Sequence, residues 1–118
     1  MSQTWIEHHD RKILYSDYRG LTEKQMIENM ELGYKMMHPC SGGVLVLVNV
    51  QGEFPIKIFM EHFSLSGRSK DAYMIAKLAA VGVKTGVMSI FLEEMSASKG
   101  ITARLFNTEQ EAKDWLIA

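Results

Sequence analysis

The chain has 118 residues, of which 47% are hydrophobic and 23% are charged, and its formal net charge is −1. This length suits a single domain, residues 1–118, with one hydrophobic core, and the composition excludes a disordered chain. The 13 basic and 14 acidic residues exclude the positive surplus that drives non-specific nucleic-acid binding.

The first segments predict a β-hairpin. Trp5–His8 reads as a short edge strand, and Lys12–Arg19 alternates in the manner of a second strand. Asp10–Arg11 is the expected turn between them. We therefore expect the chain to open with two antiparallel strands.

A helix and a buried strand are expected next. Thr22, followed by Gln25 three residues later, has the pattern of a capping box, and Pro39 ends the apolar stripe that follows. The run Val44–Val50, VLVLVNV, is almost continuously aliphatic, which is typical of a strand covered on both faces. We expect this strand at the centre of a sheet.

The middle of the chain contains one clear helix and one ambiguous segment. A second helix is predicted by the i, i+3, i+4, i+7 spacing of Ile56, Phe59, Met60 and Phe63. Residues 75–80 fit either a helix or a strand, because periodicity does not resolve short apolar runs. We expect a helical turn near Asp71–Tyr73 and a strand over Ala76–Val83.

The last third reads as helix, strand and helix. An apolar stripe of Met88, Phe91, Leu92 and Met95 predicts a third helix that ends at Gly100. Ile101–Phe106 is a predicted strand, and Thr108 begins the final helix with Glu111 as its capping partner. Strands that alternate with helices predict an α/β fold with a parallel sheet.

The runs AKLAAVGV and ITARLFNTEQEAKDWL resemble the STAS-like proteins related to the sporulation anti-sigma-factor antagonist, in particular a small stand-alone bacterial subgroup of unknown function. Ala112, Trp115 and Leu116 match the Ala-x-x-Trp-Leu helix of that subgroup. The resemblance implies a mixed, mostly parallel sheet of about five strands with four main helices. It also implies a protein-binding switch.

The phosphorylation switch of the antagonists does not carry over to this chain. In the antagonists a serine after the central strand is phosphorylated, within an Asp-Ser-Ser-Gly motif. Here Asn49–Met60 reads NVQGEFPIKIFM and contains neither serine nor threonine. The first acceptors downstream are Ser64, Ser66 and Ser69.

Polar residues follow the predicted central strand and its successor. In open α/β sheets ligands bind outside the carboxyl ends of the strands, and a helix N-terminus there suits an anion. The alternative is a plain strand-to-helix turn capped by Thr85. Apolar side chains in the same loops would anchor a protein partner. The residues expected to contact a ligand or partner are Asn49, Gln51, Glu53, Phe54, Phe59, Met60, Gly82, Lys84 and Thr85.

No catalytic residue, metal site or cofactor is predicted. His8 and His9 are adjacent, so on a strand their side chains point to opposite faces and cannot share an ion. Cys40, the single cysteine, has His38 nearby but lacks an identifiable third group to orient the pair. The single cysteine also predicts no internal disulfide.

The sequence therefore predicts a non-enzymatic regulatory or protein-interaction domain, with a homodimer as one possible assembly. The alternative is a binder of a small apolar or amphipathic ligand, in a groove between the sheet and a methionine-bearing helix. An enzyme would need Asn49, Lys84, His38 and Asp17 to converge. No nucleic-acid partner, transmembrane segment or export signal is expected, which predicts a cytoplasmic protein.

Overall fold

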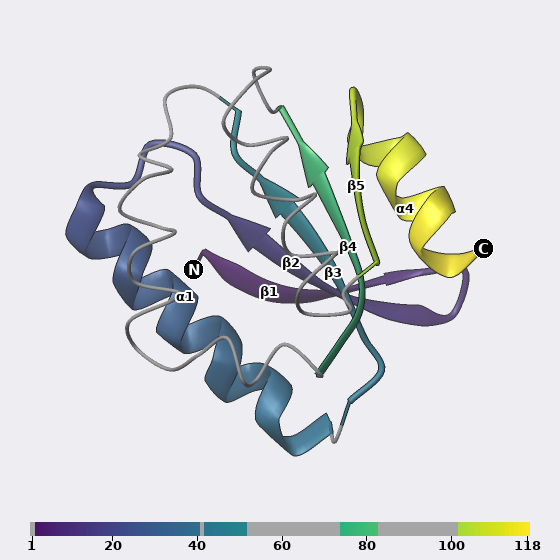
Figure 1. The fold of residues 1–118 in the computed structure, drawn as a ribbon, viewed down its shortest axis with the longest axis horizontal. Helices are drawn as coiled ribbons and strands as arrows, with labels where there is room; N and C mark the ends of the chain where they lie inside the picture. The colour runs from purple at the N-terminus through teal and green to yellow at the C-terminus, as the bar shows by residue number, and fades with distance from the viewer. Residues whose placement is uncertain (1, 41, 52–73, 83–101) are drawn as a thin grey trace.

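The computed structural model describes residues 2–40, 42–51, 74–82 and 102–118 (Figure 1). The described part contains two α-helices rather than the four expected, and the segments expected to form the other two lie outside it. None of the helices within these ranges is long and apolar enough to cross a membrane. In chain order the elements are β1 (Gln3–His8), β2 (Arg11–Asp17), α1 (Glu23–Met37), the 3-10 helix η1 (His38–Cys40), β3 (Val44–Asn49), β4 (Ile75–Val81), β5 (Thr102–Phe106) and α4 (Glu109–Ile117).

The five described strands form one sheet in the order β1-β2-β3-β4-β5. β1 runs antiparallel to β2, and β2 to β5 run parallel to one another. This confirms the predicted α/β class and the mixed, mostly parallel sheet. β3 lies at the centre and all six of its residues are buried, as the aliphatic run predicted.

The ambiguous segment 75–80 is part of strand β4. It pairs with β3 on one side and β5 on the other, and Leu78, Ala79 and Ala80 are buried. Backbone pairing to two neighbours and burial of both faces favour the strand here, although the alanines fit a helix equally well in isolation. The predicted turn at 71–73 lies outside the described residues.

The hairpin turn lies one residue earlier than expected. His8 pairs with Arg11, so the two-residue loop is His9–Asp10 rather than Asp10–Arg11. His9 has a φ of 48° and Asp10 a φ of 65°. Positive φ at both loop residues gives the backbone twist that matches the twist of the flanking strands. His9 is therefore outside the strand.

Each face of the sheet has its own apolar cluster, and Figure 1 shows the sheet lying between α1 and α4. On one face, Leu14 and Val46 pack with the α1 methionines Met26 and Met30. These methionines are only 1% and 3% exposed, as expected for core-filling side chains. On the other face, the described apolar residues are Ile13, Leu45, Leu47, Ala79 and Val81 from the sheet, and Ala112 and Leu116 from α4.

Capping side chains set where the two helices begin. The capping box of Thr22 and Gln25 is present with both of its hydrogen bonds, which confirms the predicted start of α1. At α4 the Thr108 hydroxyl accepts from the backbone N–H of Glu111 and donates to the Glu111 carboxylate. The Lys77 ammonium on β4 donates to the backbone carbonyl of Trp115 near the end of α4. Both ends of α4 are therefore tied by polar contacts.

Candidate functional site at the carboxyl edge of the sheet

Strands β2 to β5 all end at the same edge of the sheet because they are parallel. In the register of the sheet, Asp17 of β2 pairs with Asn49 of β3, Asn49 pairs with Val81 of β4, and Val81 pairs with Phe106 of β5. The residues that follow these ends are therefore neighbours in space. This is the edge at which open α/β sheets bind their ligands.

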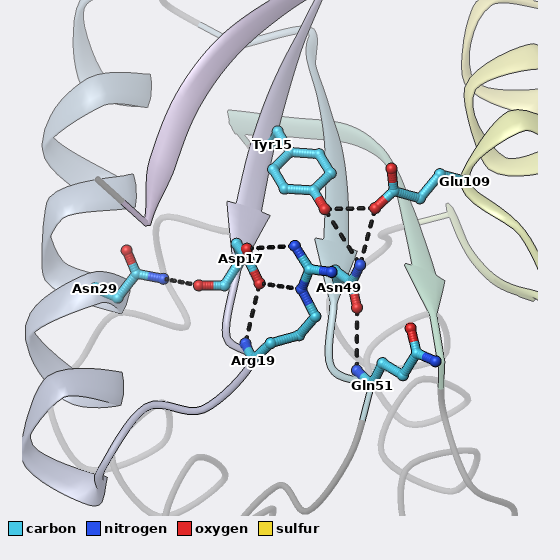
Figure 2. A network of polar contacts seen from close by, with 7 residues as sticks. All are labelled: Tyr15, Asp17, Arg19, Asn29, Asn49, Gln51 and Glu109. Carbon is cyan, nitrogen blue, oxygen red and sulfur yellow. Dashed lines mark hydrogen bonds and ion pairs between the residues drawn. The ribbon is translucent and has the colours of Figure 1, made fainter.

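Asn49 is the centre of a polar network at this edge (Figure 2). Its side chain is buried, and the residue is only 2% exposed. The Nδ2 atom donates to Glu109 Oε2 at 2.8 Å and to the Tyr15 hydroxyl at 3.2 Å, while Oδ1 accepts from the backbone N–H of Gln51 at 3.1 Å. One carboxamide thus connects β3 with β2, α4 and its own following loop.

The Tyr15 hydroxyl donates to the Glu109 carboxylate, completing a triangle with Asn49. Burial, followed by the neighbouring Glu109, raises the pKa of Tyr15 above its ordinary value of 10.0. Tyr15 is therefore neutral at physiological pH and acts as a donor. A neutral donor and an amide N–H both directed at one carboxylate stabilise its charge in a part-buried position.

Next to this triangle, Arg19 folds back onto Asp17. The guanidinium donates from Nε to Oδ1 at 2.9 Å and from Nη2 to Oδ2 at 2.8 Å, and the Arg19 backbone N–H also donates to Oδ1. Hydrogen bonding to Arg19 is the main cause that lowers the pKa of Asp17. The Arg19 side chain is 50% exposed, so this edge presents a guanidinium held in one orientation.

Gly82 brings the segments that leave β3 and β4 into direct contact. The Val50 N–H donates to the Val81 carbonyl at 3.0 Å, one residue before this glycine. Gly82 has a φ of 82°, and a Cβ atom built there would lie 2.6 to 2.8 Å from atoms of Gln51, two of them in the backbone. Only glycine fits both the left-handed backbone and the space.

The structure brings together three of the predicted contact residues, Asn49, Gln51 and Gly82. The predicted enzyme arrangement is only partly formed, because His38 precedes β3 and so lies toward the edge where that strand begins, away from Asn49. The predicted contact residues Glu53, Phe54, Phe59, Met60, Lys84 and Thr85 lie outside the described residues.

Sequence reasoning missed Tyr15, Arg19 and Glu109. Glu109 did carry a usable signal, because it follows a predicted parallel strand, whose end must lie at the same edge as the end of β3. Tyr15 is one of several alternating residues in its strand, and nothing in the sequence distinguishes it from the others. No pattern marked Arg19, since its orientation depends on the turn after β2.

No model of a known protein family matches the chain, and no curated protein or solved structure matches it either. The polar network at the carboxyl edge of the sheet is therefore the basis for proposing a function. Its polar groups clamp two strands and a helix together, and they leave an oriented guanidinium facing solvent. Such an arrangement is suited to binding a group that accepts hydrogen bonds from arginine.

Replacing Tyr15 with phenylalanine should destabilise the fold by about 1–3 kcal/mol at neutral pH, because a part-buried carboxylate loses a hydrogen bond. The raised folded-state pKa means that the hydroxyl's contribution is complete below the unfolded value near pH 10 and is lost as pH rises through the folded value. The difference in the free energy of unfolding between wild type and variant should therefore become smaller at alkaline pH. Urea unfolding at about pH 8 and about pH 11 measures both gaps. Equal gaps at the two pH values would contradict the assignment.

Proposed function

We propose that the protein is a non-enzymatic protein-interaction domain that uses the carboxyl edge of the sheet as its contact surface. The observation that carries this proposal is the exposed Arg19 guanidinium, held by two hydrogen bonds to Asp17. The STAS-like resemblance of the sequence supports it, because members of that superfamily act mostly by binding proteins. The function is thus assigned to an edge whose geometry is fixed before a partner arrives.

Pre-organisation is the physical reason for giving Arg19 this role. A free arginine side chain loses about 2 kcal/mol of rotamer entropy when it is fixed in one orientation. Asp17 has already restricted the guanidinium, so a partner that accepts from it meets a smaller entropic cost. Arginine is also among the residues that most often dominate binding energy at interfaces.

The other described residues divide into support and contact. Asn49 is buried and holds β2, β3 and α4 together, so we assign it to support. Gln51 follows two residues later and is exposed, as Arg19 is, so we assign it to contact. The apolar anchors Phe54, Phe59 and Met60 stay a prediction for the same surface.

A photo-crosslinking residue placed at position 51 tests the proposal in the organism's own cells. Lys35 supplies the matched control, because it is exposed in the last turn of α1, toward the edge where β3 begins. We expect protein adducts from the Gln51 position, and an adduct of twice the chain mass would identify a homodimer. Equal yields at the two positions, or no adduct at either, would overturn the proposal.

The second candidate is a binder of a small apolar or amphipathic ligand. A solvent-open pocket of about 230 Å³ lies beside α1 and the start of β1, and the buried Asn29 Oδ1 at its lining has no hydrogen-bond partner among the described residues. Met26 and Met30 face the core, so the pocket wall is formed by other side chains. Native mass spectrometry of the uncrosslinked protein distinguishes this candidate, since a co-purified small mass would favour it. The pocket is lined by Ser2, Leu21, Gln25, Glu28, Asn29 and Leu32.

A further inference from the structure

Three metal-binding side chains meet where the β1–β2 hairpin contacts α4, on the part of the molecule away from the polar network. His8 Nε2 lies 2.8 Å from Asp114 Oδ1, although the two residues are 106 positions apart in sequence. The rings of His8 and His9 stand edge to face with centroids 4.4 Å apart. One ligand atom from each of His8, His9 and Asp114 lies within 4.8 Å of the other two.

The expectation that His8 and His9 point to opposite faces is wrong. That expectation holds for two residues of one strand, where successive side chains alternate. His9 lies in the turn with a φ of 48°, and this backbone conformation turns its ring toward the face that carries His8. His8 lies on the α4 face, because it follows Ile6 by two residues in β1 and Ile6 packs against the cluster that contains the α4 residues.

The separations of the three groups suit a small divalent ion. A tetrahedral zinc ion with bonds of about 2.0–2.2 Å places its ligand atoms about 3.4 Å apart. The observed 2.8 Å between His8 and Asp114 is shorter than this value, and 4.8 Å is the upper bound of the set. The His8 side chain is only 15% exposed, whereas His9 and Asp114 are exposed, so rotation of these two side chains can adjust the distances.

We propose that His8, His9 and Asp114 form a binding site for a divalent transition-metal ion of the zinc type, with water completing the coordination. Two imidazoles and one carboxylate are a donor set that zinc accepts readily, and imidazole favours transition metals over magnesium or calcium. Gln110 donates to Asp114 Oδ1 at 3.1 Å and positions the carboxylate from one turn earlier on α4.

Metal binding at this place joins the hairpin to the C-terminal helix. The folded protein presents the three ligands together, whereas an unfolded chain holds Asp114 about a hundred residues away from the histidines. An ion that binds the folded state selectively raises the apparent stability. The site would therefore act as a clamp that fixes α4, and with it Glu109 at the start of that helix, against the sheet.

The test is isothermal titration of the full chain with zinc chloride, together with thermal unfolding. His9→Asn is the sharpest variant, because asparagine suits a turn residue with positive φ and removes only the imidazole. His38→Asn is the matched control, since His38 is exposed and lies outside the cluster. We expect one ion per chain for wild type and for His38→Asn, with affinity at least about tenfold weaker in His9→Asn.

The thermal midpoint of the wild type should rise with zinc and return when a chelator is added, and His9→Asn should show a smaller rise. Imidazole NMR signals of His8 and His9 in the unaltered protein provide a readout that does not depend on any variant. They should shift together on titration. Absence of saturable binding, equal weakening in His9→Asn and His38→Asn, or unmoved His8 and His9 signals would overturn the proposal.

Discussion

Replacing Gly82 with alanine should destabilise the protein by about 2–5 kcal/mol, a large fraction of the stability of a small domain. Two independent causes add. A left-handed backbone costs a residue with a Cβ about 1–2 kcal/mol, and a clash with neighbouring atoms typically costs about 1–3 kcal/mol more. The clash is severe here, because the new Cβ would lie 2.7 Å from the Cα atom of Gln51 and 2.8 Å from its backbone nitrogen. Neither atom can move without displacing the segment that leaves β3.

Gly20→Ala is the matched control for this prediction. Gly20 has a φ of 69°, close to that of Gly82, but within the described ranges of the chain a Cβ there would meet no atom closer than 4 Å. Its substitution should therefore show the conformational cost alone, about 1–2 kcal/mol. Urea unfolding of both variants isolates the steric part as the difference between them. Equal losses would mean that β3 and β4 do not approach each other as closely as the structure shows.

The sheet was predictable from the sequence because its central strand is chemically distinctive. Val44–Val50 has almost only apolar side chains, so exposing either face of this strand to water would be unfavourable and both faces are expected to be buried. The start of α1 was equally predictable, because Thr22 and Gln25 form a local capping motif that needs no tertiary context. The hairpin turn was misplaced by one residue, since His9–Asp10 lacks the glycine that usually marks a two-residue turn.

Only part of the candidate site was predictable from the sequence. The residues at the strand ends were predictable, whereas the contacts that depend on the packing of α4 were not. Asn49 ends β3, and Gln51 and Gly82 follow the ends of β3 and β4, so the topology of a parallel sheet is enough to bring them together. The contact between Tyr15 and Glu109 joins residues 94 positions apart and depends on how α4 packs on the sheet. Hydrophobic periodicity shows which face of a helix is buried, but it does not give the helix position to within a hydrogen bond.

The same limit applies to the cluster of His8, His9 and Asp114. Its existence depends on a turn that takes His9 out of the strand and on one helical turn of α4 that brings Asp114 within 2.8 Å of His8. Neither feature leaves a pattern in the sequence. The positions of these three side chains therefore depend on tertiary packing, which local sequence patterns do not predict.

Asn49→Asp should be the most damaging conservative substitution in the polar network, with an expected loss of about 2–4 kcal/mol at neutral pH. The shape of the side chain is retained, but the Nδ2 donor that bonds Glu109 at 2.8 Å becomes an oxygen. Two carboxylates would then face each other in a part-buried position. Urea unfolding of the variant and the wild type at about pH 7 measures the loss.

The loss in Asn49→Asp should shrink as pH falls from about 7 toward about 5. Two carboxylates at hydrogen-bond distance raise the pKa of the pair, because one shared proton removes the repulsion and restores a donor. A group with a raised folded-state pKa stabilises the fold when it is protonated, so the recovery must occur on the acidic side. A loss that stays constant or grows on acidification would show that charge repulsion is not its cause.

Adding Glu109→Gln to Asn49→Asp should restore much of the stability, because the glutamine amide can donate to the introduced carboxylate across the same 2.8 Å contact. Glu109→Gln alone serves as the control, since its carbonyl still accepts from Asn49. The two single variants and the double variant form a thermodynamic cycle, and we expect a coupling of at least about 1 kcal/mol. Simple additivity would mean that Asn49 and Glu109 are not partners. In that case the contact between these two side chains would not join α4 to the carboxyl edge of the sheet.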